Sequence, residues 1–285
     1  MEQEFKQSIK KALEKQNLAG ILDRWNYPAT RAAAYAGVDI EALRCQIAEI
    51  KMRAASHLDE LAEQFKKAAE ARGTKVFRAN SAQAAKDYIA NLCKEKGVKN
   101  IVKSKSMASE EIHLNEHLAK SGVTAHETDL GEWIIQLAHQ RPSHMVMPAL
   151  HLTKEEVADL FSKETRETMP TDIQHLVKVA RKELREKYFN ADMGISGANI
   201  AVAETGSVVI CTNEGNARLV STLPKTHVIL VGLEKLVEQY SDIAPILTAL
   251  PKSATSQLIT VYVSMISGPA ENTDGTPKDL HIVLM

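Results

Sequence analysis

The sequence is poor in cysteine and has no excess of charge of either sign. Its three cysteines, Cys45, Cys93 and Cys211, are odd in number and far apart, which excludes a disulfide framework and a zinc or iron–sulfur site built from these residues alone. Lys and Arg number 35 against 36 Asp and Glu, so no overall basic field attracts nucleic acid. No apolar run is long enough to span a bilayer, and residues 1–16 are charged and amphipathic rather than typical of an export signal. We therefore expect a cytoplasmic protein with no membrane span and no nucleic-acid partner.

Apolar residues, by contrast, make up 44% of the 285 residues, which suffices for a sizeable core. They recur every three or four positions from Ile40 to Phe65, which predicts one long helix ending near Gly73. Beyond it, strand-like and helical segments alternate, as in βαβ units with a mainly parallel sheet. The expected division is an N-terminal helical arm over residues 1–72 and an α/β domain over residues 73–285. The last strand-like run reaches the end of the chain, from which we expect a longer parent protein.

The alternation fixes a set of expected boundaries. Strands are predicted at residues 75–78, 100–103, 123–127, 144–147, 198–203, 207–211, 227–231, 257–263 and 280–284, and helices at 81–96, 109–120, 132–138, 153–161, 172–188 and 243–250. Thr153 with Glu156 forms a capping box, and Asp172 is the expected cap of the longest helix in this part.

Polar residues interrupt two short apolar strands between residues 194 and 220. Asn199 lies at the beginning of the first strand, and Glu204, Thr205 and Gly206 lie in the tight turn between the two. Burial in such a turn raises the pKa of a carboxyl group, which makes Glu204 a candidate for acid–base chemistry. A turn that only needs glycine for an unusual φ angle is the structural alternative. A second group, richer in amides, follows the second strand and favours a ligand-facing surface over a plain hairpin: Asn213, Glu214, Gly215, Asn216 and Arg218.

Residues 103–106, Lys-Ser-Lys-Ser, follow an expected strand and precede an expected helix. Lys103, Ser104, Lys105 and Ser106 bring two ammonium groups, two hydroxyls and the first helical amides to one place, which suits a phosphate or a carboxylate. A solvated loop with a serine N-cap explains the same residues, and the two interpretations stay open. The glycines of a P-loop are missing.

Acidic residues and single histidines give weaker candidates. Glu127 and Asp129 stand with Glu132 at another strand end, where the helix dipole accounts for part of the charge. No calcium-loop spacing is present, and we predict no metal site. His151, just past a strand end, is a candidate proton donor or anion contact, although most loop histidines are neither. His113 and His117 lack a third ligand and are interpreted as solvated helix residues.

Several long motifs carry a resemblance to a known family. They include VKSKSMASEEIHLNEHL, ETDLGEWIIQLAHQRPSHMVMPALHL, GISGANIAVAETGSVVICTNEGNARLV and the terminal LHIVL. The chain resembles the LUD (lactate utilisation) domain family from the Ile40 helix onward, most of all its B-type members, because of the long N-terminal arm. The resemblance implies a mainly parallel sheet flanked by helices, similar to ribose-5-phosphate isomerase, glucosamine-6-phosphate isomerase and the CoA transferases.

The resemblance also implies a functional context. B-type members carry iron–sulfur clusters in a ferredoxin-like region that follows the domain, and they act with two partner subunits in oxidising L-lactate to pyruvate. The three cysteines of this chain match none of the cluster ligands. Electron transfer is therefore not expected of these residues alone, and no cofactor is predicted in this chain.

Two hypotheses follow for these residues. In the first, the domain handles a small anionic substrate: Lys103, Ser104 and Lys105 contact the anion, Arg218 pairs its carboxylate near Asn213 and Asn216, and Glu204 or His151 moves a proton. In the second, it is a non-catalytic module that binds a phosphorylated or CoA-like ligand, or only its partner subunits. Both leave open an assembly of several copies of the chain.

Overall fold

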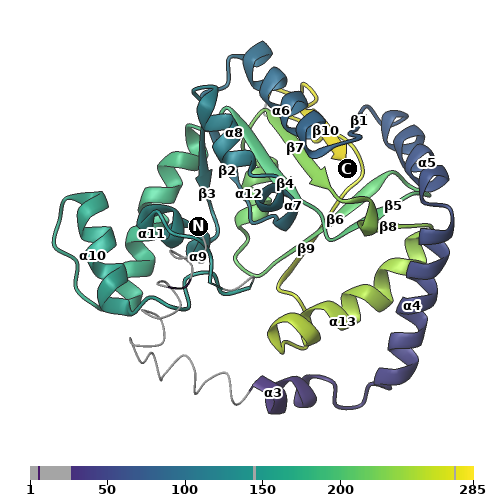
Figure 1. The fold of residues 1–285 in the computed structure, drawn as a ribbon, viewed down its shortest axis with the longest axis horizontal. Helices are drawn as coiled ribbons and strands as arrows, with labels where there is room; N and C mark the ends of the chain where they lie inside the picture. Colours follow the sequence, from purple (N-terminus) through teal and green to yellow (C-terminus); the bar gives the residue numbers. More distant parts are fainter. Residues whose placement is uncertain (1–5, 7–26, 144–145, 273) are drawn as a thin grey trace.

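The computed structural model describes residue 6 and residues 27–143, 146–272 and 274–285. Ten strands in these ranges form two sheets (Figure 1). The strands are β1 (Lys75–Arg78), β2 (Asn100–Lys103), β3 (Thr124–Glu127), β4 (Met193–Gly197), β5 (Ile200–Val202), β6 (Ser207–Thr212), β7 (Thr226–Val231), β8 (Leu236–Val237), β9 (Tyr262–Ile266) and β10 (Asp279–Leu284). Most lie within a residue or two of the predicted positions.

The helices of the described residues surround the sheets. They are α3 (Tyr27–Ala34), α4 (Ile40–Ser56), α5 (Leu58–Glu70), α6 (Ala82–Lys96), α7 (Met107–Glu111), α8 (Leu114–Lys120), α9 (Leu130–Ala138), α10 (Lys154–Thr165), α11 (Ile173–Phe189), α12 (Asn216–Thr222) and α13 (Ile243–Thr255), with short 3-10 turns η1 (Leu233–Lys235) and η2 (Tyr240–Asp242). Among the described residues, no helix combines the length and the apolar character needed to cross a membrane.

The larger sheet has six strands in the order β1-β10-β7-β4-β2-β3, and every pair in it is parallel. The smaller sheet has the order β8-β5-β6-β9 and contains two antiparallel pairs. The predicted α/β class, with a mainly parallel sheet flanked by helices, is confirmed. The finer similarity to the isomerases and CoA transferases stays a prediction, as does the division at residues 72 and 73.

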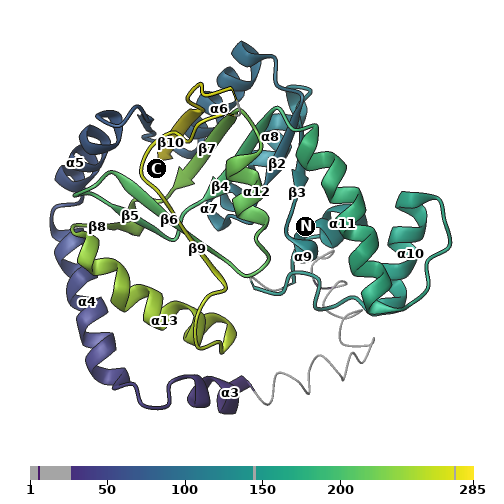
Figure 2. The same cartoon turned by 180° about the vertical axis from the view of Figure 1, so that it is seen from behind.

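Strand β7 shows how the larger sheet is buried on both faces. Val228 and Leu230 point to the side covered by α6 and α8, where they pack with Ile89 and Leu114. Ile229, between them, points to the opposite side and packs against α5 and the smaller sheet. Because successive side chains of a strand alternate, a continuous apolar run of this kind is typical of a parallel strand between two layers. Helices α9, α10 and α11 cover the β2–β3 side of the molecule (Figures 1 and 2).

The single long helix predicted from Ile40 to Gly73 was wrong, because the chain breaks at His57. His57 has φ −144° and ψ 44°, outside the helical region, and separates α4 from α5. Its Nε2 lies 2.8 Å from Glu238 Oε1. The apolar spacing runs through the break without interruption, so it contains no signal for two helices. The helix predicted over residues 109–120 is likewise divided, at His113, whose φ of 53° is left-handed.

Other elements also differ from the prediction, which contained neither β4 nor β8. Of the strand predicted at residues 144–147, residues 144 and 145 lie outside the described residues, and Val146 and Met147 are not in a strand. The strand predicted over 257–263 is β9, which begins only at Tyr262. The amide-rich loop contains the start of helix α12, at Asn216. The amphipathic segment noted at residues 1–16 lies outside the described residues, Lys6 excepted. The capping box of Thr153 with Glu156 and the Asp172 cap are both confirmed.

A cluster of charges at the start of β10 predicts how stability depends on pH. Asp279 lies 2.8 Å from Lys75 Nζ, 2.6 Å from Lys96 Nζ and 3.0 Å from His281 Nε2. Burial raises the pKa of Asp279, but these three neighbours outweigh it and hold the pKa well below the usual range. Because its pKa is lower in the folded state, Asp279 stabilises the protein fully only above the carboxyl's unfolded pKa of about 4. This stabilisation is lost as pH falls through the folded-state pKa.

We therefore expect Asp279→Asn to lower the free energy of unfolding by about 1 kcal/mol at pH 7, since the cluster is partly solvated. The deficit should shrink as pH falls below about 4. Urea unfolding between pH 3 and pH 7 measures both effects, with the exposed Asp159→Asn as control. A difference in unfolding free energy between the wild type and Asp279→Asn that stays constant from pH 7 to pH 3 would contradict this interpretation.

Candidate active-site cleft

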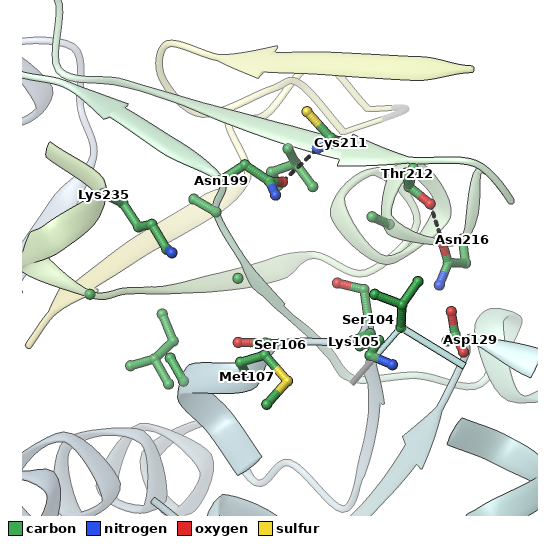
Figure 3. Close-up of a pocket in the computed structure, with 18 of the residues that line it drawn as sticks. Ser104, Lys105, Ser106, Met107, Asp129, Asn199, Cys211, Thr212, Asn216 and Lys235 are labelled. Atoms are coloured by element: carbon green, nitrogen blue, oxygen red, sulfur yellow. Dashed lines mark hydrogen bonds between the residues drawn. The ribbon is translucent and has the colours of Figure 1, made fainter. Parts of the chain in front are cut away.

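A cleft of about 800 Å³ opens at the carboxyl ends of the parallel strands (Figure 3). Its walls come from residues that follow β2, β3, β4, β7 and β10, together with the end of β6 and the start of α12. Ligands of open parallel sheets bind at this edge, because the loops there converge on one space. The cleft gathers these predicted site residues: Ser104, Lys105, Ser106, Asp129, Asn199, Asn213, Glu214 and Asn216.

The loop after β2 forms the floor of the cleft. Ser104 donates its backbone N–H to Ile195 O at 2.9 Å, which fixes the loop against β4. Ser106 is the N-cap of α7, and its hydroxyl accepts a hydrogen bond from Ser109 N at 3.4 Å. A Cβ on Gly197 would lie 2.8 Å from Ser106 Oγ, so glycine is needed where β4 passes this loop. Ser104 is 4% exposed and lines the cleft, and among the described residues its hydroxyl has no hydrogen-bond partner.

Two amide side chains are oriented with their NH₂ groups available. Asn199 Oδ1 accepts a hydrogen bond from Cys211 N at 2.8 Å. Asn216 Oδ1 accepts one from the Thr212 hydroxyl at 2.7 Å. Since each oxygen already has a donor, each nitrogen is left to donate (Figure 3). The cleft therefore presents two amide donors and the Ser104 hydroxyl, all of them uncharged.

Two carboxylates face these donors from neighbouring loops. Asp129 is the N-cap of α9 and accepts a hydrogen bond from Glu132 N at 3.2 Å. Glu214 accepts one from Leu130 N at 3.3 Å. Burial raises the pKa of Glu214, and repulsion by Asp129 raises it further, against smaller opposing effects of Leu130 N–H and Lys105. Together the donors and acceptors suit a small molecule with a carboxylate and a hydroxyl group.

Lys105 lines the cleft, but its charge is already balanced. Its Nζ lies 2.9 Å from Glu132 Oε1, and the side chain of Glu132 is almost fully buried. The geometry of this ion pair is not that of a hydrogen bond, so the buried ammonium protons have no hydrogen-bond partner among the described residues. The predicted anion contact by Lys105 stays a prediction.

Lys103 lies inside the protein and is not among the residues that line the cleft. Its side chain is fully buried, with Nζ 2.7 Å from Glu110 Oε1, 2.9 Å from Glu127 Oε1 and 3.0 Å from Ser109 Oγ. Burial lowers the pKa of Lys103, but the two carboxylates outweigh it and keep the ammonium charged. Lys103 and Glu127 thus join the end of β2 to α7 and β3, which positions the Ser104 loop.

Glu204, Thr205 and Gly206 lie at the other end of the β5–β6 hairpin. Asn199 precedes β5 and Thr212 ends β6, so the open end of the hairpin faces the cleft and its turn points away. Glu204 Oε2 accepts a hydrogen bond from Tyr240 N at 2.7 Å, and Gly206 packs on α5. These contacts give the turn a structural role, and the acid–base role predicted for Glu204 receives no support from its position.

Three other candidates lie outside the residues that line the cleft. His151 Nε2 lies 2.7 Å from Gln140 Oε1. The Arg218 guanidinium lies over the ring of Tyr262, 4.8 Å from its centroid, in a cation–π contact. Gly215 is the N-cap of α12 and has φ 73°, a conformation that favours glycine. The proton transfer predicted for His151 and the carboxylate pairing predicted for Arg218 stay predictions.

Sequence reasoning missed part of the far wall. Lys235, Glu234 and Gly232 follow β7, Met285 follows β10, and Glu111 ends α7; all five line the cleft. Lys235 lies at the opposite end of the cleft from Asp129 (Figure 3). The signal was present, because Gly232 directly follows a buried parallel strand at the same edge as Ser104 and Asn199.

The cysteines do not fit an iron–sulfur cluster. Cys45 is exposed on α4, and Cys93 lies on the buried face of α6 that covers the larger sheet. Cys211 lies in strand β6 of the smaller sheet, and burial raises the pKa of Cys93 and Cys211 to about 11. Clusters need several thiolates within one coordination sphere. Within the described ranges no group of three His, Cys, Asp or Glu residues is arranged to hold a metal ion.

Comparison with known proteins gives consistent matches. The LUD domain family matches residues 62–285. Lactate utilization protein B of Bacillus velezensis is 38% identical over 288 residues, covering 99% of this chain and 60% of the relative. The protein of that name from Bacillus subtilis is 42% identical over 239 residues, covering 83% of this chain and 50% of the relative. The chain therefore spans between half and three-fifths of the length of these curated relatives.

A solved structure is also similar. The crystal structure of a DUF162 family protein from Deinococcus radiodurans aligns with a TM-score of 0.43 and 11% identity, covering 80% of this chain and 98% of that one.

Proposed function

The chain belongs to the LUD domain family, and we propose that it is the substrate-binding domain of a B-type lactate-utilisation protein that takes part in oxidising L-lactate to pyruvate. The single observation that carries the proposal is the cleft at the carboxyl ends of the parallel strands, in which uncharged donors face carboxylates. L-Lactate carries one carboxylate and one hydroxyl on neighbouring carbons, so it needs donors and an acceptor side by side.

Each group of the cleft has a place in this proposal. The amide of Asn199 and the hydroxyl of Ser104 donate to the ligand carboxylate, because neither has another acceptor among the described residues. Glu214 and Asp129 accept from the ligand hydroxyl. The oxidation itself needs an electron acceptor, which we assign to iron–sulfur clusters and partner subunits outside these residues, since the three cysteines fit no cluster. This domain binds and orients the acid.

Calorimetric titration with L-lactate and with pyruvate tests the proposal. We expect binding at one site per chain and a loss of at least about tenfold in affinity for Asn199→Asp, about 1.4 kcal/mol. The aspartate keeps an oxygen for Cys211 N but replaces the donor with a negative charge.

The exposed Asn190→Asp adds the same charge outside the cleft and should leave the affinity unchanged. Absence of any binding of lactate or pyruvate, together with a tight complex with partner subunits, would instead support a pure assembly module.

A further inference from the structure

The charges that line the cleft are predominantly negative. Among the described residues two lysines line it against four carboxylates: Lys105 and Lys235 against Glu111, Asp129, Glu214 and Glu234. Neither lysine is uncompensated, because Lys105 lies 2.9 Å from Glu132 and Lys235 lies 3.4 Å from Glu234. A site for a phosphate ester or another polyanion needs an excess of Arg, Lys or helix amides. This cleft has the opposite balance.

The cleft nevertheless presents hydrogen-bond donors suited to a ligand with acceptor atoms. Ser104 is 4% exposed, and its hydroxyl lies at the cleft with no partner among the described residues. This hydroxyl is not among the unpaired atoms buried away from solvent, so it opens into the cleft and is free to donate to a ligand oxygen. The amides of Asn199 and Asn216 add two uncharged donors nearby. Donors without charge can hold one carboxylate but give little compensation to a second negative charge.

We propose that the cleft takes an acid with a single negative charge, a short 2-hydroxy or 2-oxo acid, and that Asp129 and Glu214 exclude ligands with two or more negative charges. This inference rests on the proposed function and adds the charge selection. Repulsion acts on each ligand charge, so a dianion is penalised more than a monoanion of similar size. The carboxylate pair thereby acts as a repulsive selectivity element, and it argues against a phosphorylated or CoA-like ligand.

Glu214 makes this selection dependent on pH. The charged and titratable groups that face it are Asp129, Lys105 and Tyr188, in addition to the Leu130 N–H. Because burial and Asp129 raise the pKa of Glu214, it takes up a proton at a higher pH than an ordinary glutamate does. One repulsive charge disappears on protonation, so exclusion of dianions should weaken as pH falls.

The test compares ligands that differ in charge. Dissociation constants are measured by calorimetry at pH 7.5 for L-lactate, for L-2-hydroxybutyrate as a larger monoanion, and for L-malate and sulfate as dianions. We expect the two monoanions to bind within about threefold of each other and both dianions at least about tenfold more weakly than L-lactate. In the double variant Asp129→Asn/Glu214→Gln the preference for L-lactate over sulfate should fall at least about tenfold.

Both substitutions keep the hydrogen bonds that these side chains accept, and asparagine remains a good N-cap for α9. Glu186→Gln, exposed on α11, is the matched control and should keep the wild-type preference. Sulfate stays doubly charged between pH 5.5 and pH 8, so its affinity should rise as pH falls in the wild type and stay flat in the double variant.

The outcomes separate the two proposals. If L-lactate binds but L-malate and sulfate bind equally well, charge selection is wrong and the proposed function stands. If L-lactate binds more tightly than the dianions but the double variant keeps this full preference, Asp129 and Glu214 do not cause it. The proposed selection by these two carboxylates is then wrong. If neither monoanion binds while a dianion does, or no ligand binds at all, both proposals are overturned.

Discussion

Replacing Lys103 with methionine is expected to lower the free energy of unfolding by about 3–5 kcal/mol, because it removes one partner of a buried ion pair. The side chain of Lys103 is fully buried and that of Glu127 is 5% exposed. Methionine fills most of the volume but leaves Glu127 beside an apolar group. Asn115 still donates to its Oε1, while Oε2 already has no partner among the described residues. Chemical denaturation at pH 7 measures the loss.

A second variant separates charge from packing at this position. Lys103→Met/Glu127→Gln removes both charges, so it should be more stable than Lys103→Met alone. The exposed Lys182→Met on α11 is the control and should change stability by less than about 0.5 kcal/mol. A loss below about 1 kcal/mol for Lys103→Met would mean that this ion pair does not hold the Ser104 loop in place.

Gly206→Ala is expected to cost about 2–5 kcal/mol of unfolding free energy. Gly206 has φ +63°, where a residue with a Cβ pays about 1–2 kcal/mol. An added Cβ would also collide with α5, because it would lie 2.2 Å from Ala69 N and 2.6 Å from Ala68 C. These are backbone atoms that cannot rotate away, so overpacking adds about 1–3 kcal/mol. Thermal and urea unfolding both report the change.

Gly122→Ala provides the matched control. Gly122 also has a positive φ, +76°, but a Cβ there meets nothing within 4 Å. Gly122→Ala should therefore lower the free energy of unfolding only by the cost of the positive φ angle, about 1–2 kcal/mol. The difference between the two variants therefore measures how closely the β5–β6 turn packs on α5. Equal losses in both would contradict the packing recorded at Gly206.

Sequence patterns predicted most of the fold because the strongest signals are local. The buried runs 228–231 of β7 and 282–284 of β10 are apolar, as is typical of strands covered on both faces. Asp172 and Thr153 mark the start of their helices, because their side chains cap backbone N–H groups three residues later and need no contact with the rest of the fold. The break at His57 was not predictable, since the apolar spacing continues through it and the neighbour of His57 in the fold, Glu238, lies far away in the sequence.

The candidate site was predicted in part for the same reason. Ser104, Asn199 and Asp129 all follow parallel strands, and the carboxyl ends of such strands share one edge. Glu204 stands equally close to a strand end, but that strand belongs to a hairpin whose turn points away from this edge. The sequence does not show which end of an antiparallel hairpin faces the parallel sheet. The anion contact predicted for Lys103 stays a prediction, and the sequence did not show that its side chain points into the protein beside Glu127.

The proposed function depends on a small carboxylate binding in the cleft. Titration of isotopically labelled protein with L-lactate, followed by backbone amide chemical shifts, tests this most directly. The account predicts saturable shifts concentrated at residues 104–107, 197–199 and 212–217, which line or adjoin the cleft, and their loss in Asn199→Asp. Shifts concentrated around Glu204 or His151, or none at saturating lactate, would contradict it.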